Sequence, residues 1–98
     1  MVNLQTENIA SIGNYFKNKP VIRAYLFGSA VRSDINEKSD IDILVELDYS
    51  LPIGMAFYEM SSDLEALTNR KVDLVSANGL SKHILPFIEK EKVLIYAR

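Results

Sequence analysis

The sequence contains no cysteine among its 98 residues. Disulfide bonds and cysteine–zinc sites are therefore excluded, and a small chain without disulfides is expected in a reducing cytoplasm. No basic segment followed by an apolar run stands at the N-terminus, so a secretory signal peptide is not expected. The apolar runs fall far short of the roughly 18 residues that a membrane helix requires, so a membrane is not expected as a partner.

Charge of one sign is also scarce, because 11 lysines and arginines stand against 13 aspartates and glutamates, for a net charge of −2. A dedicated nucleic-acid binder carries a basic stripe, so stable nucleic-acid binding is not expected. The hydrophobic fraction of 48% is typical of a globular protein. A chain of this length builds one modest core, so residues 1–98 are expected to form a single domain. Its substrate pocket is expected to be small or to be shared with another molecule.

Hydrophobic periodicity predicts alternating helices and strands. Helices are expected over residues 4–18, 55–69 and 81–90. Strands are expected over residues 21–27, 40–47, 71–76 and 93–96. A further helical turn is expected over residues 29–33. This order predicts an α/β (α+β) fold in which a small mixed β-sheet packs against helices.

Several residues are expected to have structural roles only. One face of the helix over residues 55–69 is expected to pack on the core. Its members are Phe57, Met60, Leu64 and Leu67. Met55 is also expected to fill the core. The single histidine, His83, is expected on a helix surface, where it serves as neither a base nor a metal ligand.

Three aspartates interrupt the predicted strands. Asp40 and Asp42 stand two residues apart in one strand, so their side chains share a face, and Asp73 interrupts the next strand. Aspartates that cap turns would be a purely structural explanation. However, aspartate is disfavoured in strands and neighbouring carboxylates repel each other, so the three residues are candidates for a functional site. Such carboxylates are hard oxygen ligands, and three of them can hold two Mg²⁺ ions for phosphoryl or nucleotidyl transfer.

Gly28 and Ser29 follow the strand that precedes the aspartates. A glycine at a strand end lets the backbone approach a phosphate, and N–H groups that open a helical turn attract anions. Ser29 adds a hydroxyl donor. Arg32 adds a planar fork of donors that suits phosphate, although it can also pair with Asp34 or Glu37 on the surface. The sequence therefore predicts a phosphate-binding turn opposite the carboxylates.

The segments Tyr25–Arg32 and Ser39–Val45 resemble the minimal nucleotidyltransferases of the DNA polymerase beta-like superfamily. The signature of that family is a Gly-Ser pair, ten further residues and then Asp-x-Asp, and this chain matches it without a gap. The strand that contains Asp73 resembles the one that carries the third carboxylate of the family. Ser33 is a small departure, because many relatives have a glycine there.

This resemblance implies the polymerase-beta-like fold and an enzyme that uses Mg²⁺, as two ions, to transfer AMP from ATP to a hydroxyl. The implied site residues are Asp40, Asp42 and Asp73 for catalysis and metal binding, and Gly28, Ser29 and Arg32 for the nucleotide phosphates. Minimal proteins of this family are often antitoxins that modify a tyrosine of a HEPN-domain toxin. Two alternatives stay open: an antitoxin that acts by binding alone, and a nucleotidyltransferase that acts on a small molecule or a tRNA.

Overall fold

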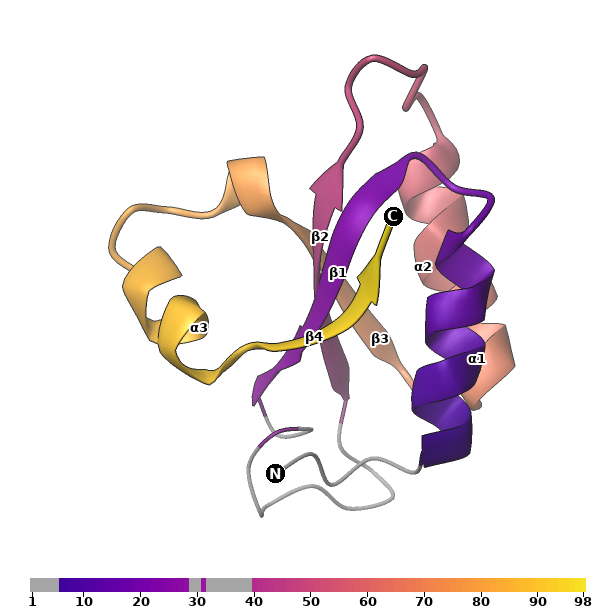
Figure 1. Cartoon of the computed structure of the whole chain (residues 1–98), viewed down its shortest axis with the longest axis horizontal. Helices are drawn as coiled ribbons and strands as arrows, with labels where there is room; N and C mark the ends of the chain where they lie inside the picture. The colour runs from indigo at the N-terminus through magenta and orange to yellow at the C-terminus, as the bar shows by residue number, and fades with distance from the viewer. Residues whose placement is uncertain (1–5, 29–30, 32–39) are drawn as a thin grey trace.

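The computed structural model describes residues 6–28, 31 and 40–98. Its helices are α1 (Thr6–Phe16), α2 (Ala56–Thr68) and α3 (Leu85–Glu91), and a short 3-10 helix, η2, spans Ala77–Gly79 (Figure 1). Its strands are β1 (Val21–Phe27), β2 (Ile41–Leu47), β3 (Val72–Ser76) and β4 (Val93–Ala97). The helical turn expected over residues 29–33 lies outside the described residues except for Val31.

The four strands form one mixed sheet in the order β3-β2-β1-β4. Strand β1 pairs in antiparallel fashion with β2 and with β4, whereas β2 and β3 run parallel. A parallel pair needs a crossover between its strands, and α2 supplies this connection from β2 to β3. The expected small mixed sheet packed with helices is thus confirmed.

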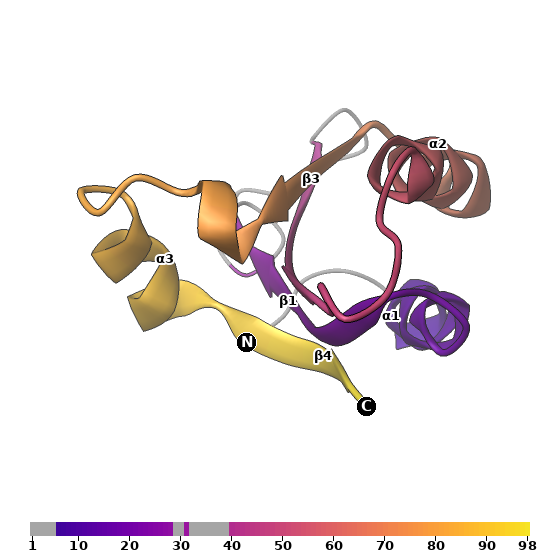
Figure 2. The same ribbon diagram turned by 90° about the horizontal axis from the view of Figure 1, so that it is seen from above.

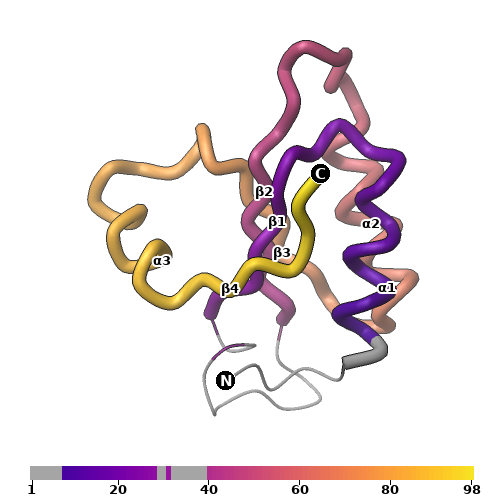
Figure 3. Tube along the Cα trace, in the orientation of Figure 1, coloured from indigo at the N-terminus to yellow at the C-terminus, as the bar shows by residue number. Residues whose placement is uncertain are grey.

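Helices α1 and α2 cover one face of this sheet, and α3 lies on the opposite side, as the view from above shows (Figure 2). The chain leaves the end of β3 through η2, passes through α3 and returns along β4 (Figure 3). Among the helices that the structure describes, none combines the length and apolar character that crossing a bilayer would require.

The hydrophobic core lies between the sheet and the pair α1 and α2. Strand β2 contributes every second residue to it, as its alternating sequence predicts. These core residues are Ile41, Ile43, Val45 and Leu47. The helices contribute Ile12, Phe16, Met60 and Leu64, all with 1% of their surface or less exposed. Burial of such side chains stabilises the fold by roughly 1.5–3 kcal/mol each.

Two expectations about apolar residues in α2 or directly before it are wrong. Leu67 is 45% exposed and Met55 is 67% exposed, so neither fills the core. Thr68 takes the buried position instead, where its hydroxyl donates a hydrogen bond of 2.7 Å to the carbonyl oxygen of Leu64. The reason is geometric, because Met60, Leu64 and Thr68 follow one another at intervals of four residues on one face of the helix.

Candidate active site

Two of the three predicted aspartates are neighbours across the sheet. In the register of the strands, Asp42 pairs with Phe27 of β1 on one side and with Asp73 of β3 on the other. Paired residues of adjacent strands project from the same face of a sheet, and adjacent strands lie about 4.8 Å apart. The end of β1 and the starts of β2 and β3 therefore lie together at one end of the strands, which is the lower end of the sheet in Figure 1.

The two carboxylates lie on the face opposite the core. Asp42 is half-buried and Asp73 is exposed, while Ile41, Ile43 and Leu74 beside them in the chain are buried. Asp40 comes just before β2 and is exposed. The alternation of these strands thus separates the residues that hold the fold from the residues that are available for chemistry.

Gly28 lies directly against the carboxylate of Asp42. A β-carbon built on Gly28 would lie 2.2 Å from Oδ2 of Asp42, closer than any stable contact. The backbone φ of Gly28 is +68°, a conformation that residues with a β-carbon rarely adopt. Both observations require glycine here. They place Gly28, the first residue of the predicted phosphate-binding turn, beside Asp42, one of the predicted metal ligands.

Both backbone groups of Gly28 have partners in the structure. Its carbonyl oxygen accepts a hydrogen bond of 3.1 Å from the N–H of Val31, which closes a turn. Its own N–H donates a hydrogen bond of 2.8 Å to Oε1 of Glu91, at the end of α3. The predicted phosphate ligands Ser29 and Arg32 lie outside the described residues, so their roles stay predictions.

The donor set fits Mg²⁺. This ion is commonly held by one or two protein carboxylates together with substrate phosphates and water, and Asp42 and Asp73 supply two carboxylates at adjacent register positions. In the part of the chain that the structure describes, no three acidic or histidine side chains are grouped closely enough to hold a metal ion by themselves. The roles of Asp40, Asp42 and Asp73 as metal ligands therefore stay predictions.

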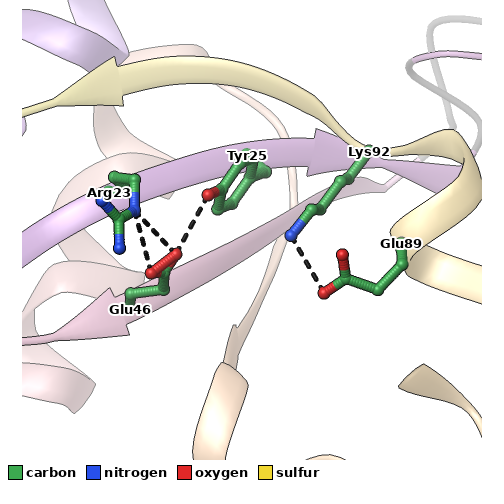
Figure 4. Close-up of polar contacts among 5 residues, drawn as sticks. All are labelled: Arg23, Tyr25, Glu46, Glu89 and Lys92. Atoms are coloured by element: carbon green, nitrogen blue, oxygen red, sulfur yellow. Dashed lines mark hydrogen bonds and ion pairs between the residues drawn. The ribbon is translucent and has the colours of Figure 1, made fainter. Parts of the chain in front are cut away.

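A cluster of charged side chains lies further along the same face (Figure 4). Arg23 donates from Nε to both carboxylate oxygens of Glu46, at 2.9 and 3.0 Å, and the hydroxyl of Tyr25 donates to Oε1 at 3.0 Å. The hydrogen bond from Arg23 lowers the pKa of Glu46 below its usual value. The ammonium group of Lys92 lies 4.1 Å from the centre of the Tyr25 ring and binds Glu89 at 3.0 Å.

Glu91 is the residue of this site that sequence reasoning missed. It is separated from Gly28 by 63 positions, and it stands in a helix whose other acidic residue, Glu89, is exposed. No local pattern distinguishes the two glutamates. Only the packing of α3 beside the end of β1 brings Glu91 to the site.

Comparison with known proteins agrees with this geometry. The family model described as polymerase beta, nucleotidyltransferase matches residues 10–98. The protein adenylyltransferase MntA of Thermococcus cleftensis is 39% identical over 70 residues, which cover 71% of this chain and 70% of that protein.

Solved structures show the same fold. A crystal structure of a toxin–antitoxin with AMP-PNP superimposes with a TM-score of 0.74 at 24% identity, over 97% of this chain and 75% of that chain. A tri-AMPylated HEPN toxin from Shewanella oneidensis in complex with its MNT antitoxin gives a TM-score of 0.68 at 22% identity. That match covers 97% of this chain and 74% of the other. At these identities the likeness establishes the fold alone.

Proposed function

The chain belongs to the polymerase beta nucleotidyltransferase family, and we propose that it is a Mg²⁺-dependent protein adenylyltransferase. Its proposed reaction moves AMP from ATP to a tyrosine hydroxyl of a HEPN-domain toxin, which it thereby silences as an antitoxin. The observation that supports the proposal is the register of Asp42 with Asp73 beside Gly28, because it brings two predicted metal ligands and the predicted phosphate-binding glycine together at one end of the strands.

The proposed step is an in-line transfer. A bond forms between the acceptor oxygen and the α-phosphorus of ATP, the bond from this phosphorus to the bridging oxygen breaks, and pyrophosphate leaves. Asp40 and Asp42 would hold Mg²⁺, and Asp73 would complete a second metal site and help to deprotonate the acceptor hydroxyl. Mg²⁺, when bound, neutralises phosphate charge and makes the hydroxyl easier to deprotonate.

The relatives support the choice of acceptor. MntA of Thermococcus cleftensis is named a protein adenylyltransferase. In the Shewanella oneidensis complex, the HEPN toxin bound to its antitoxin carries three AMP groups. This chain has the same fold, and its exposed carboxylate Asp73 is open to an acceptor from outside.

Turnover is the test of the proposal. A HEPN toxin is mixed with a hundredfold smaller amount of this protein, with ATP and Mg²⁺, and its residual activity and mass are followed. We expect the toxin to lose its activity and to gain the mass of AMP on tyrosine. Asp42→Asn is expected to abolish the transfer, because it removes a metal ligand, while the fold stays intact or becomes more stable through loss of charge repulsion. Transfer that continues unchanged in Asp42→Asn would exclude the proposed role of this residue.

The second candidate is an antitoxin that acts by binding alone. It is favoured by apolar side chains exposed on α3, where Ile84 just before the helix is 52% exposed and Phe87 is 73% exposed. Such residues suit a protein interface. The same experiment separates the two functions: a binder protects only at equimolar dose, protects without ATP and leaves the toxin mass unchanged.

A further inference from the structure

We propose that Glu91 is a positioning residue of the active site. It holds the backbone of Gly28, where the turn closed by Val31 begins, in the conformation that Asp42 and the nucleotide require. The kinetic part of this inference rests on the proposed adenylyltransferase function. The structural part rests on contacts of Gly28 and of the junction between α3 and β4.

The first step concerns a backbone N–H group that needs an acceptor. Strand β4 begins at Val93, which pairs with Leu26, so the ladder between β1 and β4 ends before it reaches Gly28. Beyond the end of this ladder, the carboxylate of Glu91 supplies the acceptor. It accepts a hydrogen bond of 2.8 Å from the Gly28 N–H in a partly buried position. Hydrogen bonds to ionised acceptors are stronger than those between neutral groups.

The second step concerns the other side of Gly28. The carboxylate of Asp42 occupies the space where a β-carbon of Gly28 would lie. Gly28 is therefore held between Glu91 on its N–H and Asp42 on its Cα. Any movement of Gly28 therefore changes the surface against which the Asp42 carboxylate rests. Displacements of this kind reduce catalysis steeply, because a misplacement of about 1 Å can lower a rate a hundredfold.

The third step concerns what holds Glu91 itself. Ile88, one turn earlier in α3, is buried, and its carbonyl oxygen accepts the N–H of Lys92 at 2.8 Å. The side chain of Lys92 lies over the ring of Tyr25 and binds Glu89 (Figure 4). Lys92, the residue after Glu91, is thus held to α3 through its backbone and to β1 through the Tyr25 ring, and β1 ends directly before Gly28. This arrangement presents the Glu91 carboxylate to the turn.

Three substitutions separate positioning from a role that depends on charge. Glu91→Gln removes the charge but keeps an acceptor oxygen at the same reach. Glu91→Asp keeps the charge but shortens the side chain by one methylene, so that the oxygen no longer reaches the Gly28 N–H. Glu91→Ala removes both. Glu59→Gln is the matched control, since it neutralises an exposed carboxylate of α2 that takes no part in holding Glu91.

The expected kinetic pattern follows from reach. We expect kcat/KM for ATP to stay near the wild-type value in Glu91→Gln and Glu59→Gln, and to fall about tenfold or more in Glu91→Asp and Glu91→Ala. Thermal melts confirm that the compared variants are folded. An active Glu91→Asp together with an inactive Glu91→Gln would overturn the proposal, because this pattern indicates a charge-dependent role such as metal binding. Equal activity of all four folded variants would overturn it as well.

An NMR measurement decides the inference independently of activity. The amide proton signal of Gly28 is expected to shift upfield most in Glu91→Asp and Glu91→Ala. It should shift less in Glu91→Gln, which keeps a weaker, neutral acceptor, and stay in place in Glu59→Gln. A Gly28 signal that stays in place in Glu91→Ala overturns the proposal. A wild-type protein that transfers no AMP contradicts the proposed function, and in that case the amide signal still decides whether Glu91 holds the turn.

Discussion

Gly28 meets two requirements that act at the scale of a single residue. Its φ of +68° lies in the left-handed region, and the space beside its Cα is filled by the Asp42 carboxylate. The first requirement is one of backbone conformation and the second is one of volume. Gly54 differs in the second respect, because its φ is +46° but no atom lies within 4 Å of the position of an added β-carbon. The two glycines therefore allow the contributions to be separated.

Gly54→Ala is expected to lower the free energy of unfolding by about 1–2 kcal/mol, the cost of a left-handed alanine. Gly28→Ala is expected to cost more than this, because it also displaces Asp42, and to lower the rate of AMP transfer about a hundredfold. Urea unfolding and transfer assays on the two variants measure these effects. In an Asp42→Ala background the extra cost of Gly28→Ala should disappear. An extra cost that persists there would show that the collision with Asp42 is not its source.

Strands β2 and β3 show a conflict at the scale of the element. Their parallel register places Asp42 opposite Asp73, and like charges that face each other across a sheet destabilise the pairing. The neighbouring buried residues, among them Ile43 and Leu74, hold the two strands together in spite of this repulsion. A cation bound between the carboxylates would relieve it.

Asp73→Asn is therefore expected to raise the free energy of unfolding by about 0.2–1 kcal/mol when Mg²⁺ is absent. Mg²⁺ with ATP is expected to raise the Tm of the wild-type protein, because ligands that bind the folded state stabilise it, and to raise that of the variant less. Thermal melts with and without Mg²⁺ measure both effects. Glu59→Gln is the charge-matched control, since Glu59 is an exposed residue of α2. An equal response to Mg²⁺ in all three proteins would contradict a metal site at Asp73.

The elements themselves were largely predictable, and the errors have physical causes. The strand expected over residues 21–27 is β1, and that expected over 40–47 is β2 without its first residue. The third predicted helix begins later than expected, at Leu85, because Pro86 occupies the first turn of α3 and residues 81–84 form a separate turn. His83 is exposed, as expected, but it lies in this turn.

The site was predictable where its residues are close in sequence or share a strand pattern. Alternation along β2 places Asp42 on the face away from the core, and the parallel pairing then brings Asp73 beside it. The part that Glu91 takes was not predictable, because a contact across 63 positions depends on how α3 packs. Nor does the sequence reveal that Gly28 lies against Asp42, since that contact depends on the register of β1 with β2.

At the scale of the whole molecule, the sheet separates stability from chemistry. One face is buried under α1 and α2, and the other carries Asp42, Asp73 and the cluster around Glu46. Substitutions of the polar residues on this second face are therefore expected to change activity more than they change folding. Strand β4 pairs with a neighbour on one side only, because it lies at the edge of the sheet, so contacts beyond its ladder help to hold its end in place.

Arg98, directly after β4, makes such contacts. Its backbone N–H donates to the carbonyl oxygen of Ile22 at 2.8 Å, and its guanidinium group binds the carboxylate of Asp48, just after β2. The hydrogen bond from Arg98, with further ones from Ser50, lowers the pKa of Asp48 to about 2. The ionised Asp48 carboxylate thus links the end of β2 to the end of β4, and the backbone of Arg98 joins the end of β4 to β1.

The stability of the molecule should therefore depend on pH in a way that Asp48 controls. A carboxyl group whose pKa is lower in the folded state binds fewer protons there than in the unfolded chain, where its pKa is about 3.9. Its contribution is complete above pH of about 4 and is lost as the pH falls towards 2. Asp48→Asn has no carboxyl group there to protonate. Its Tm should therefore fall less than that of the wild-type protein between about pH 5 and about pH 2, as measured by thermal melts at a series of pH values. Glu59→Gln, which removes an exposed charge from α2, serves as the control and should follow the wild-type curve. Parallel curves for Asp48→Asn and the wild-type protein would show that the link to Arg98 does not contribute to folding.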